Sequence, residues 1–211
     1  MPMTDDTSNM PPNERTAVVK RLTRVYDGFL KIDEALVSHP RHDGGRQTVT
    51  RQCMERGDSV AVLIVDTSAH KVWLTEQFRY PTLAKGPGWI EEVPAGMLKD
   101  EEDFETAATR EVAEETGIKD LTLEHISTFY VSPGGTSERT ILYAAFVEQV
   151  SPDLAYSRAH QDKDEDIALV DRDIDEFIQA AIRGDINDAK TLIAGLWLNA
   201  NLHRLDTTSK D

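Results

Sequence analysis

The chain has 211 residues, of which 39% are hydrophobic and 29% are charged, as expected for a globular protein with a single main core. Its formal net charge of −15 opposes binding to nucleic acid and to anionic membranes, so we expect neither as a partner. The one cysteine, Cys53, excludes an internal disulfide. Residues 1–14 lack the apolar run of a signal peptide, and no stretch has the roughly 18 apolar residues of a membrane helix, so we expect a cytoplasmic protein.

The first predicted elements form a small antiparallel β unit. Residues 1–14 are polar and contain three prolines, which is typical of a disordered tail. Short alternating apolar runs between residues 17 and 37, and again at 48–54, indicate strands, and the proline and two glycines of 39–46 indicate a turn. We expect residues 15–57 to form an N-terminal β unit that needs another surface to cover it, because so few strands are marginally stable alone.

The following elements alternate between strands and helices, which predicts an α/β fold. Residues 59–65 are a continuous apolar run, which indicates a strand buried on both faces. Further strands are expected at 72–77, 89–93, 121–130, 140–147 and 167–170, and helices at 173–183 and 189–202. We expect one domain over residues 58–204, followed by a disordered tail at 205–211.

The clearest helix precedes Gly117. Its apolar residues recur at helical spacing, at Phe104, Ala107, Ala108 and Val112. Asp100 is the expected N-cap, because a short acidic side chain accepts hydrogen bonds from the first amides of a helix. Gly117 is the expected C-terminal glycine, which can adopt the left-handed conformation there.

Three glutamates share one side of this helix. Glu111 is three residues before Glu114 and four before Glu115, so the side chains are co-facial. Like charges at this spacing destabilise a helix unless they act as hard oxygen ligands for Mg²⁺ or Mn²⁺. Such metals polarise phosphates and activate water, and Arg110 could orient one of the carboxylates. The alternative is a solvated acidic face without a ligand.

The spacing around the helix resembles a known family. Nine positions match the fixed residues of the Nudix box, namely Gly96, Glu102, Arg110, Glu111, Val112, Glu114, Glu115, Gly117 and Ile118. At average residue frequencies such a match arises by chance with a probability on the order of 10⁻⁹ per register. The resemblance to Nudix hydrolases implies an α/β/α sandwich with a mixed sheet. It also implies Mg²⁺-dependent hydrolysis of a nucleoside diphosphate linked to another moiety.

From about residue 17 to residue 202, the chain is similar to the ADP-ribose pyrophosphatase branch, which includes GDP-mannose pyrophosphatases. The matching segments are residues 76–79, 92–96, 132–138 and 164–167. Pro133 lies sixteen residues after Gly117, the spacing associated with this branch. The resemblance implies a homodimer in which the N-terminal units are exchanged and help to build the partner's site.

The resemblance also implies a set of metal ligands. They are the Ala95 carbonyl, Glu111 and Glu115, with Glu114 and Glu102 in support and Glu165 joining when substrate is bound. The branch normally has two acids in the pattern Glu-x-Glu-Asp at this last position. Here Lys163 replaces the first of them, which puts the usual catalytic base in doubt. We take Glu165 as the first choice for the base or late ligand, with Asp162 and Glu138 as alternatives.

The substrate contacts implied by the resemblance come from several segments. Arg79 is expected to bind the phosphates, Arg56 and Glu92 to lie near the nucleotide or ribose, and Gly135 and Glu138 to contribute from the glycine-rich loop 132–138. Each has a simpler alternative. Arg79 could be an ordinary surface arginine, Arg56 the solvated end of a strand, and the loop only a tight turn.

Three functional hypotheses follow from these residues. The first is hydrolysis of ADP-ribose to AMP and ribose 5-phosphate. The second is the same reaction on GDP-mannose or another nucleotide sugar, since the segment 184–191 resembles both groups. The third is a Nudix domain that senses a nucleotide without cutting it. Such domains commonly lose carboxylates of the box, and none is lost here.

Overall fold

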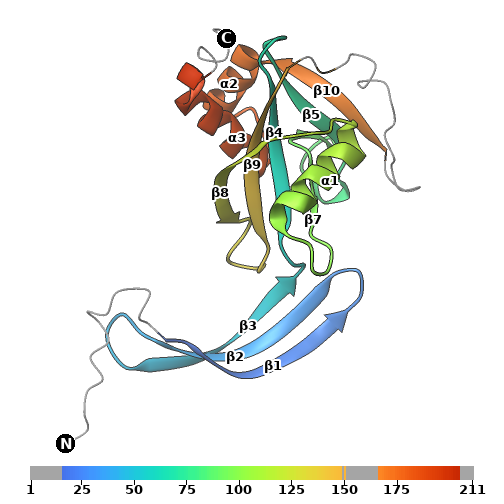
Figure 1. The fold of residues 1–211 in the computed structure, drawn as a ribbon. Coiled ribbons are helices and arrows are strands. Elements are labelled where there is room, and N and C mark those ends of the chain that lie inside the picture. The colour runs from blue at the N-terminus through green and yellow to red at the C-terminus, as the bar shows by residue number, and fades with distance from the viewer. Residues whose placement is uncertain (1–15, 149, 151–165, 205–211) are drawn as a thin grey trace, which may run out of the picture. The chain divides into compact units, whose positions relative to one another are not determined.

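The computed structural model describes residues 16–148, 150 and 166–204 (Figure 1). The segment that contains Lys163 and Glu165 lies outside these described residues. The chain divides into two compact units. The first comprises the described residues up to Gly57 together with 132–138, and the second comprises 58–131 and the described residues from Arg139 onward.

The described part of the first unit is a three-stranded antiparallel sheet in the order β1-β2-β3. The strands are β1 (Val18–Asp27), β2 (Lys31–Pro40) and β3 (Arg46–Glu55). The predicted turn between β2 and β3 is confirmed, and Gly44 and Gly45 adopt positive φ angles of 88° and 71° in it. The loop 132–138 joins this sheet, because Met54 donates its amide to the Gly135 carbonyl at 2.8 Å.

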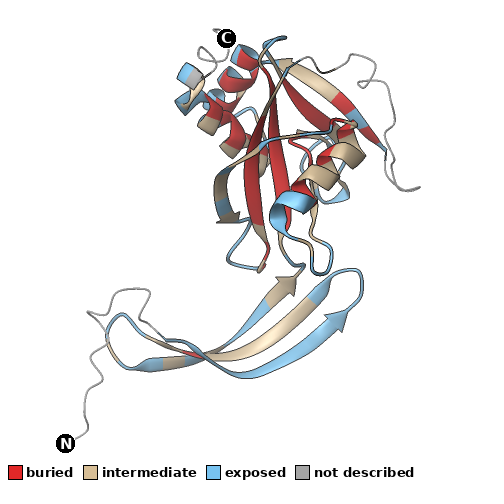
Figure 2. Cartoon of the chain, viewed as in Figure 1, coloured by how far each residue is buried: buried red, intermediate tan, exposed pale blue. Residues whose placement is uncertain are grey.

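Strand β1 leaves its side chains exposed along its whole length (Figure 2). The large apolar residues among them are Val18, Val19, Leu22, Val25 and Tyr26. A run of exposed apolar side chains of this length is unusual on a monomer and is typical of surfaces that bind another chain.

The described residues of the second unit contain a seven-stranded mixed sheet. Its main path runs β10-β5-β4-β9-β8, with β6 paired to β5 and β7 paired to β4. The strands are β4 (Ser59–Asp66), β5 (Lys71–Phe78), β6 (Trp89–Glu92), β7 (Ala95–Met97), β8 (Leu123–Tyr130), β9 (Arg139–Val147) and β10 (Ile167–Asp173). Strand β4 pairs in parallel with β9, and the other pairings are antiparallel. The predicted mixed sheet is confirmed.

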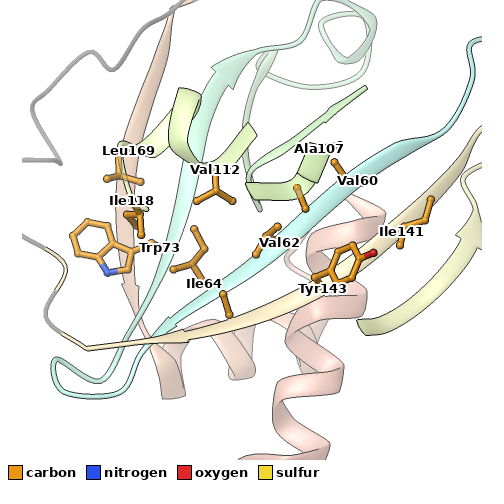
Figure 3. Packing of buried hydrophobic residues seen from close by; sticks show 12 residues of the cluster. Val60, Val62, Ile64, Trp73, Ala107, Val112, Ile118, Ile141, Tyr143 and Leu169 are labelled. Carbon is orange, nitrogen blue, oxygen red and sulfur yellow. The ribbon is translucent and has the colours of Figure 1, made fainter. Parts of the chain in front are cut away.

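Strand β4 is the centre of the core, and all eight of its residues are buried. Successive side chains of a strand point to opposite faces of a sheet. Val60, Val62 and Ile64 therefore pack on one face with apolar residues of α1 (Phe104–Thr116), as Figure 3 shows. Residues of α2 (Ile174–Arg183) and α3 (Ala189–Ala200) cover the other face. The layers form the expected α/β/α sandwich. Short 3₁₀ helices lie after β5, at Tyr80–Thr82, and after α3, at Leu202–Arg204.

The predicted N-cap of α1 was wrong. The cap is Asp103, whose carboxylate accepts the Thr106 amide at 3.0 Å, and not Asp100. Glu101 has a positive φ of 62°, so the chain turns before the helix begins and Glu102 accepts the Lys99 amide. The other end is as expected, with Gly117 left-handed at φ 75°.

The described residues include no helix that is both long and apolar enough to cross a membrane.

Candidate functional site

Gly96 and Glu111 lie in close contact. Strand β7 pairs with β4 and lies beside α1, with Gly96 opposite Val60. A Cβ atom on Gly96 would lie 2.0 Å from the Glu111 Cδ, well inside van der Waals contact. The glycine is therefore needed because the carboxylate of Glu111 lies directly against the backbone of β7.

Glu115 lies beside the same strand, one helical turn further along α1. Its Oε2 accepts the Ala95 amide at 3.2 Å, so the backbone of Ala95 and the two co-facial carboxylates meet at one place. Burial, with the nearby charge of Glu111, raises the pKa of Glu115 to about 8. Burial also raises the pKa of Glu111, despite its contact with Arg110. Two enclosed carboxylates that resist ionisation in this way are suited to a divalent cation.

Arg110 organises the other carboxylates of the box. Its Nε and Nη2 form a fork with the two oxygens of Glu102, each at 2.8 Å. Its Nη1 donates to Glu111 at 2.7 Å and to Glu114 at 3.0 Å. The hydrogen bonds from Arg110 lower the pKa of Glu102 to about 2, with help from the Lys99 amide. The sequence predicted that Arg110 orients one carboxylate, and the structure shows it holding three.

The charge at the box remains negative after these contacts are counted. Glu102, Glu111, Glu114 and Glu115 face Arg110 and the more distant Lys99, which approaches Glu114 at 3.7 Å. When all four acids are ionised, four negative charges meet two positive ones. This set of carboxylate oxygens fits a hard divalent ion such as Mg²⁺ or Mn²⁺.

A second charged group surrounds Glu92 at the end of β6. The Glu92 side chain is only 3% exposed. Its Oε1 accepts a hydrogen bond from Arg79 Nε at 2.7 Å and forms an ion pair with Arg79 Nη2, also at 2.7 Å. Lys190 donates to its Oε2 and also reaches Asp188 at 3.0 Å. Both oxygens of Glu92 are thus taken by cations of the protein. The sequence reasoning identified Arg79 and Glu92 but missed Lys190, whose only signal was its place in the segment 184–191.

The remaining predicted residues of the described chain lie in the first unit. Arg56 pairs with Glu138 at 3.3 Å, and Glu138 is buried. The loop 132–138 makes a tight turn, since Gly135 and Thr136 both donate their amides to the Ser132 carbonyl. The turn is compatible with both interpretations of this loop. It is also fixed to β3, because Ser137 donates to Glu55 at 2.7 Å.

An exposed acidic group lies away from the box residues in the sequence. Ligand atoms of His70, Asp173 and Asp175 lie within 4.8 Å of one another, and all three residues are exposed. The Asp173 carboxylate already caps α2 by accepting the amides of Asp175 and Glu176. Exposed acids with this local structural role give no further sign of a metal, and the enclosed carboxylates of the box are the better candidates.

Comparison with known proteins identifies the family. Residues 55–185 match the NUDIX domain. This chain belongs to the Nudix family. It is 30% identical to the ADP-ribose pyrophosphatase of Haemophilus influenzae, over 88% of this chain and 87% of that protein. It is 32% identical to the ADP-ribose pyrophosphatase of Escherichia coli K12, over 82% of this chain and 83% of that protein. It is 33% identical to the GDP-mannose pyrophosphatase of Pectobacterium atrosepticum, over 72% of this chain and 78% of that protein.

The family membership confirms that the protein is a Nudix pyrophosphohydrolase, an enzyme class that uses divalent metal ions. The predicted family, branch and enzyme class are therefore confirmed. The roles of individual residues, the identity of the metal and the substrate stay predictions.

Proposed function

We propose that this Nudix enzyme hydrolyses the pyrophosphate bond of ADP-ribose, with Mg²⁺, to give AMP and ribose 5-phosphate. The observation that carries the proposal is the extent of the similarity. Relatives named for ADP-ribose align with 88% and 82% of the chain, whereas the relative named for GDP-mannose aligns with 72%. The spacing from Gly117 to Pro133 supports the same branch of the family.

The metal would be held by Glu111, Glu115 and the carbonyl of Ala95. Glu114 and Glu102 would support these ligands through their contacts with Arg110. A divalent ion bound there would neutralise charge on the phosphates and lower the pKa of the attacking water. We favour Mg²⁺, with Mn²⁺ as the second choice, because every donor is a hard oxygen.

Substrate binding would use the cations that lie near the box. Arg79 would donate to the phosphates, since its side chain is 42% exposed although it is anchored on Glu92. Glu165, which lies outside the described residues, would take the proton from water or join a metal. Lys163 is a poor base because its ordinary pKa of about 10.4 keeps it protonated at neutral pH.

The first unit would complete the site in a homodimer. We propose that the N-terminal units are exchanged between two copies, and that Arg56, Gly135 and Glu138 contribute to nucleotide binding. The exposed apolar side chains of β1 support this assembly, because a sheet of so few strands gains stability when another surface covers it. We expect a cytoplasmic enzyme with a small-molecule substrate and no nucleic-acid or membrane partner.

GDP-mannose, or another nucleoside diphosphate sugar, is the alternative substrate. The relative named GDP-mannose pyrophosphatase supports it at 33% identity. The same carboxylates and arginine would serve the same pyrophosphate group, and the two substrates differ in the base and the sugar. The chemistry at the box therefore does not distinguish them, and specificity has to be measured.

The test is a panel of nucleoside diphosphate sugars assayed with Mg²⁺ and a coupled phosphomonoesterase. The coupling enzyme releases phosphate from AMP and ribose 5-phosphate but not from the intact diphosphate, so the signal reports cleavage. We expect the highest kcat/KM for ADP-ribose, both products by mass spectrometry, and no signal with excess chelator. A higher kcat/KM for GDP-mannose would replace the proposed substrate with the alternative.

A further inference from the structure

The first turn of α3 is anchored to the short segment between β6 and β7. Asp188 caps the helix by accepting the amide and the hydroxyl of Thr191, at 2.9 and 2.6 Å. The Thr191 hydroxyl accepts the Val93 amide at 2.9 Å, and both residues are buried. These contacts fix the start of α3 against the chain just before Ala95. Lys190 lies within this anchored turn and is therefore held close to Glu92.

Arg79, Glu92 and Lys190 form a group in which two cations contact the two oxygens of one carboxylate. Glu92 and Lys190 are 3% and 15% exposed, whereas Arg79 is 42% exposed, so only Arg79 presents much of its side chain to solvent. Arg79 uses two nitrogens on Oε1 of Glu92, and Lys190 takes Oε2. The arrangement divides the single charge of Glu92 between the two cations.

We propose that Lys190 is a positioning residue that keeps the charge of Arg79 available to a substrate phosphate. If Lys190 were absent, both oxygens of Glu92 would face Arg79. A bidentate pair between an arginine and an enclosed carboxylate is stronger than a contact to a single oxygen. Arg79 would then be neutralised and drawn toward Glu92. Asp188 also pairs with Lys190, so the two cations and two carboxylates are together neutral. Removal of Lys190 would leave this group with one net negative charge beside the bound phosphate. The inference rests on the proposed function, in which Arg79 binds phosphate.

The primary test compares Lys190→Met with Lys71→Met. The methionine keeps much of the apolar stem of lysine but removes its charge. Lys71 is a matched control, because it pairs with Asp171 at 2.6 Å at the opposite end of β5 from Arg79. We expect Lys190→Met to raise KM about tenfold, the effect of weakening one charge-assisted hydrogen bond, with a much smaller change in kcat. Lys71→Met should leave both constants near those of the wild type.

A second set of variants separates positioning from a structural role. We expect Lys190→Arg to keep KM within about threefold of the wild type, because a cation still meets Glu92. We expect Glu92→Gln combined with Lys190→Met to lower KM relative to Lys190→Met alone, because Arg79 loses its remaining anionic partner. A residue that only stabilises α3 would give no such recovery. Lys190→Gln, which retains a hydrogen-bond donor, replaces the methionine variant if that variant does not fold.

The outcomes distinguish this inference from the proposed function. Kinetics are measured on the best substrate of the panel, and a wild-type enzyme that cuts none of them refutes the proposed function itself. If the wild type is active and the KM of Lys190→Met, or of Lys190→Gln in its place, is within twofold of the wild-type KM, the positioning role is refuted. A raised KM without recovery in the double variant also refutes it, because the effect then does not pass through Glu92.

Discussion

Gly96 and the carboxylate of Glu111 lie in direct contact, since a methyl group on Gly96 would be 2.0 Å from Glu111 Cδ. The atoms that would clash belong to the end of a flexible side chain, so Gly96→Ala should displace the carboxylate and leave the fold intact. We expect kcat to fall about 100-fold, as for a displacement of about 1 Å in a catalytic group, with little change in the melting temperature. Steady-state kinetics and thermal denaturation of the same preparation measure both effects.

Gly86→Ala is the control for this glycine. A Cβ on Gly86 would meet only the Thr82 carbonyl at 3.6 Å, an ordinary contact. Equal kinetic losses in the two alanine variants would mean that the effect of Gly96→Ala does not come from the Glu111 carboxylate.

Glu115→Gln should abolish most of the activity and preserve the fold. The variant removes the charge of a proposed metal ligand, so kcat should fall by several orders of magnitude, and calorimetry should show weaker Mn²⁺ binding. Burial raises the pKa of Glu115 to about 8, so the neutral glutamine should be well tolerated by the metal-free protein. Near-normal turnover by a folded Glu115→Gln variant would exclude α1 as the catalytic centre.

The proposed catalytic base, Glu165, predicts how strongly kcat should fall when each of three residues is substituted. Hydrolysis needs a group within hydrogen-bond reach of the attacking water that can take its proton. Glu165→Gln should reduce kcat strongly with little change in KM, Glu138→Gln should reduce it less, and Lys163→Glu should leave the enzyme active. A nearly silent Glu165→Gln together with an inactive Glu138→Gln would place the base on the loop 132–138.

If the exposed apolar side chains of β1 form the proposed dimer interface, charged substitutions among them should dissociate the dimer. Leu22 is 64% exposed, and burying such a side chain contributes about 1.5–3 kcal/mol. Leu22→Lys combined with Val25→Lys should shift the protein from dimer to monomer in light scattering and lower its activity in parallel. A wild-type monomer that is fully active at nanomolar concentration would refute the assembly.

The turn after β4 predicts a pH-dependent contribution to stability. Burial alone would raise the pKa of Asp66, but donors from Val150, Ala69 and Ser68 outweigh it and hold the pKa below its ordinary value. A lowered folded-state pKa stabilises the fold above the unfolded-state value near 4, and this stabilisation is lost as the pH falls through the folded-state pKa. Asp66→Asn should cost about 1–3 kcal/mol at pH 7 in urea denaturation.

The difference in stability between Asp66→Asn and the wild type should narrow below about pH 4, because the carboxyl of the unfolded wild type then takes up a proton while that of the folded state, with its lowered pKa, stays ionised to lower pH. A difference that is constant from pH 7 to pH 3 would show that the carboxylate charge is not the cause.

Local patterns were sufficient for most of the fold but not for the charged contacts. The apolar run of β4 and the helical spacing of α1 depend on neighbours in the sequence, and both were predicted correctly. The N-cap was missed because Asp100 and Asp103 are equally able to cap. The chain selects Asp103 because Glu102 folds back to Arg110, eight residues away.

Lys190 was missed for a related reason. Its partner Glu92 is 98 residues earlier in the chain, and nothing in the local sequence connects the two. The pairing of loop 132–138 with β3 depends on a similarly distant contact. Contacts of this kind are made by tertiary structure, so a single sequence indicates the residues but not which of them meet.

The pairing of β7 with β4 also determines how the site can move. Ala95 pairs with Ala61 and Gly96 with Val60 in the antiparallel ladder between the two strands. Next to this ladder, the Val62 amide donates to the Pro94 carbonyl at 3.0 Å. All three β4 residues are fully buried, so these hydrogen bonds belong to the part of a protein that opens last in native-state hydrogen exchange. If Ala95 holds the metal as proposed, we expect this part of the site to open only when the whole domain unfolds. We therefore expect substrate entry and product release to be accommodated by segments other than β7, so that the backbone beside the Glu111 and Glu115 carboxylates stays in place from one turnover to the next.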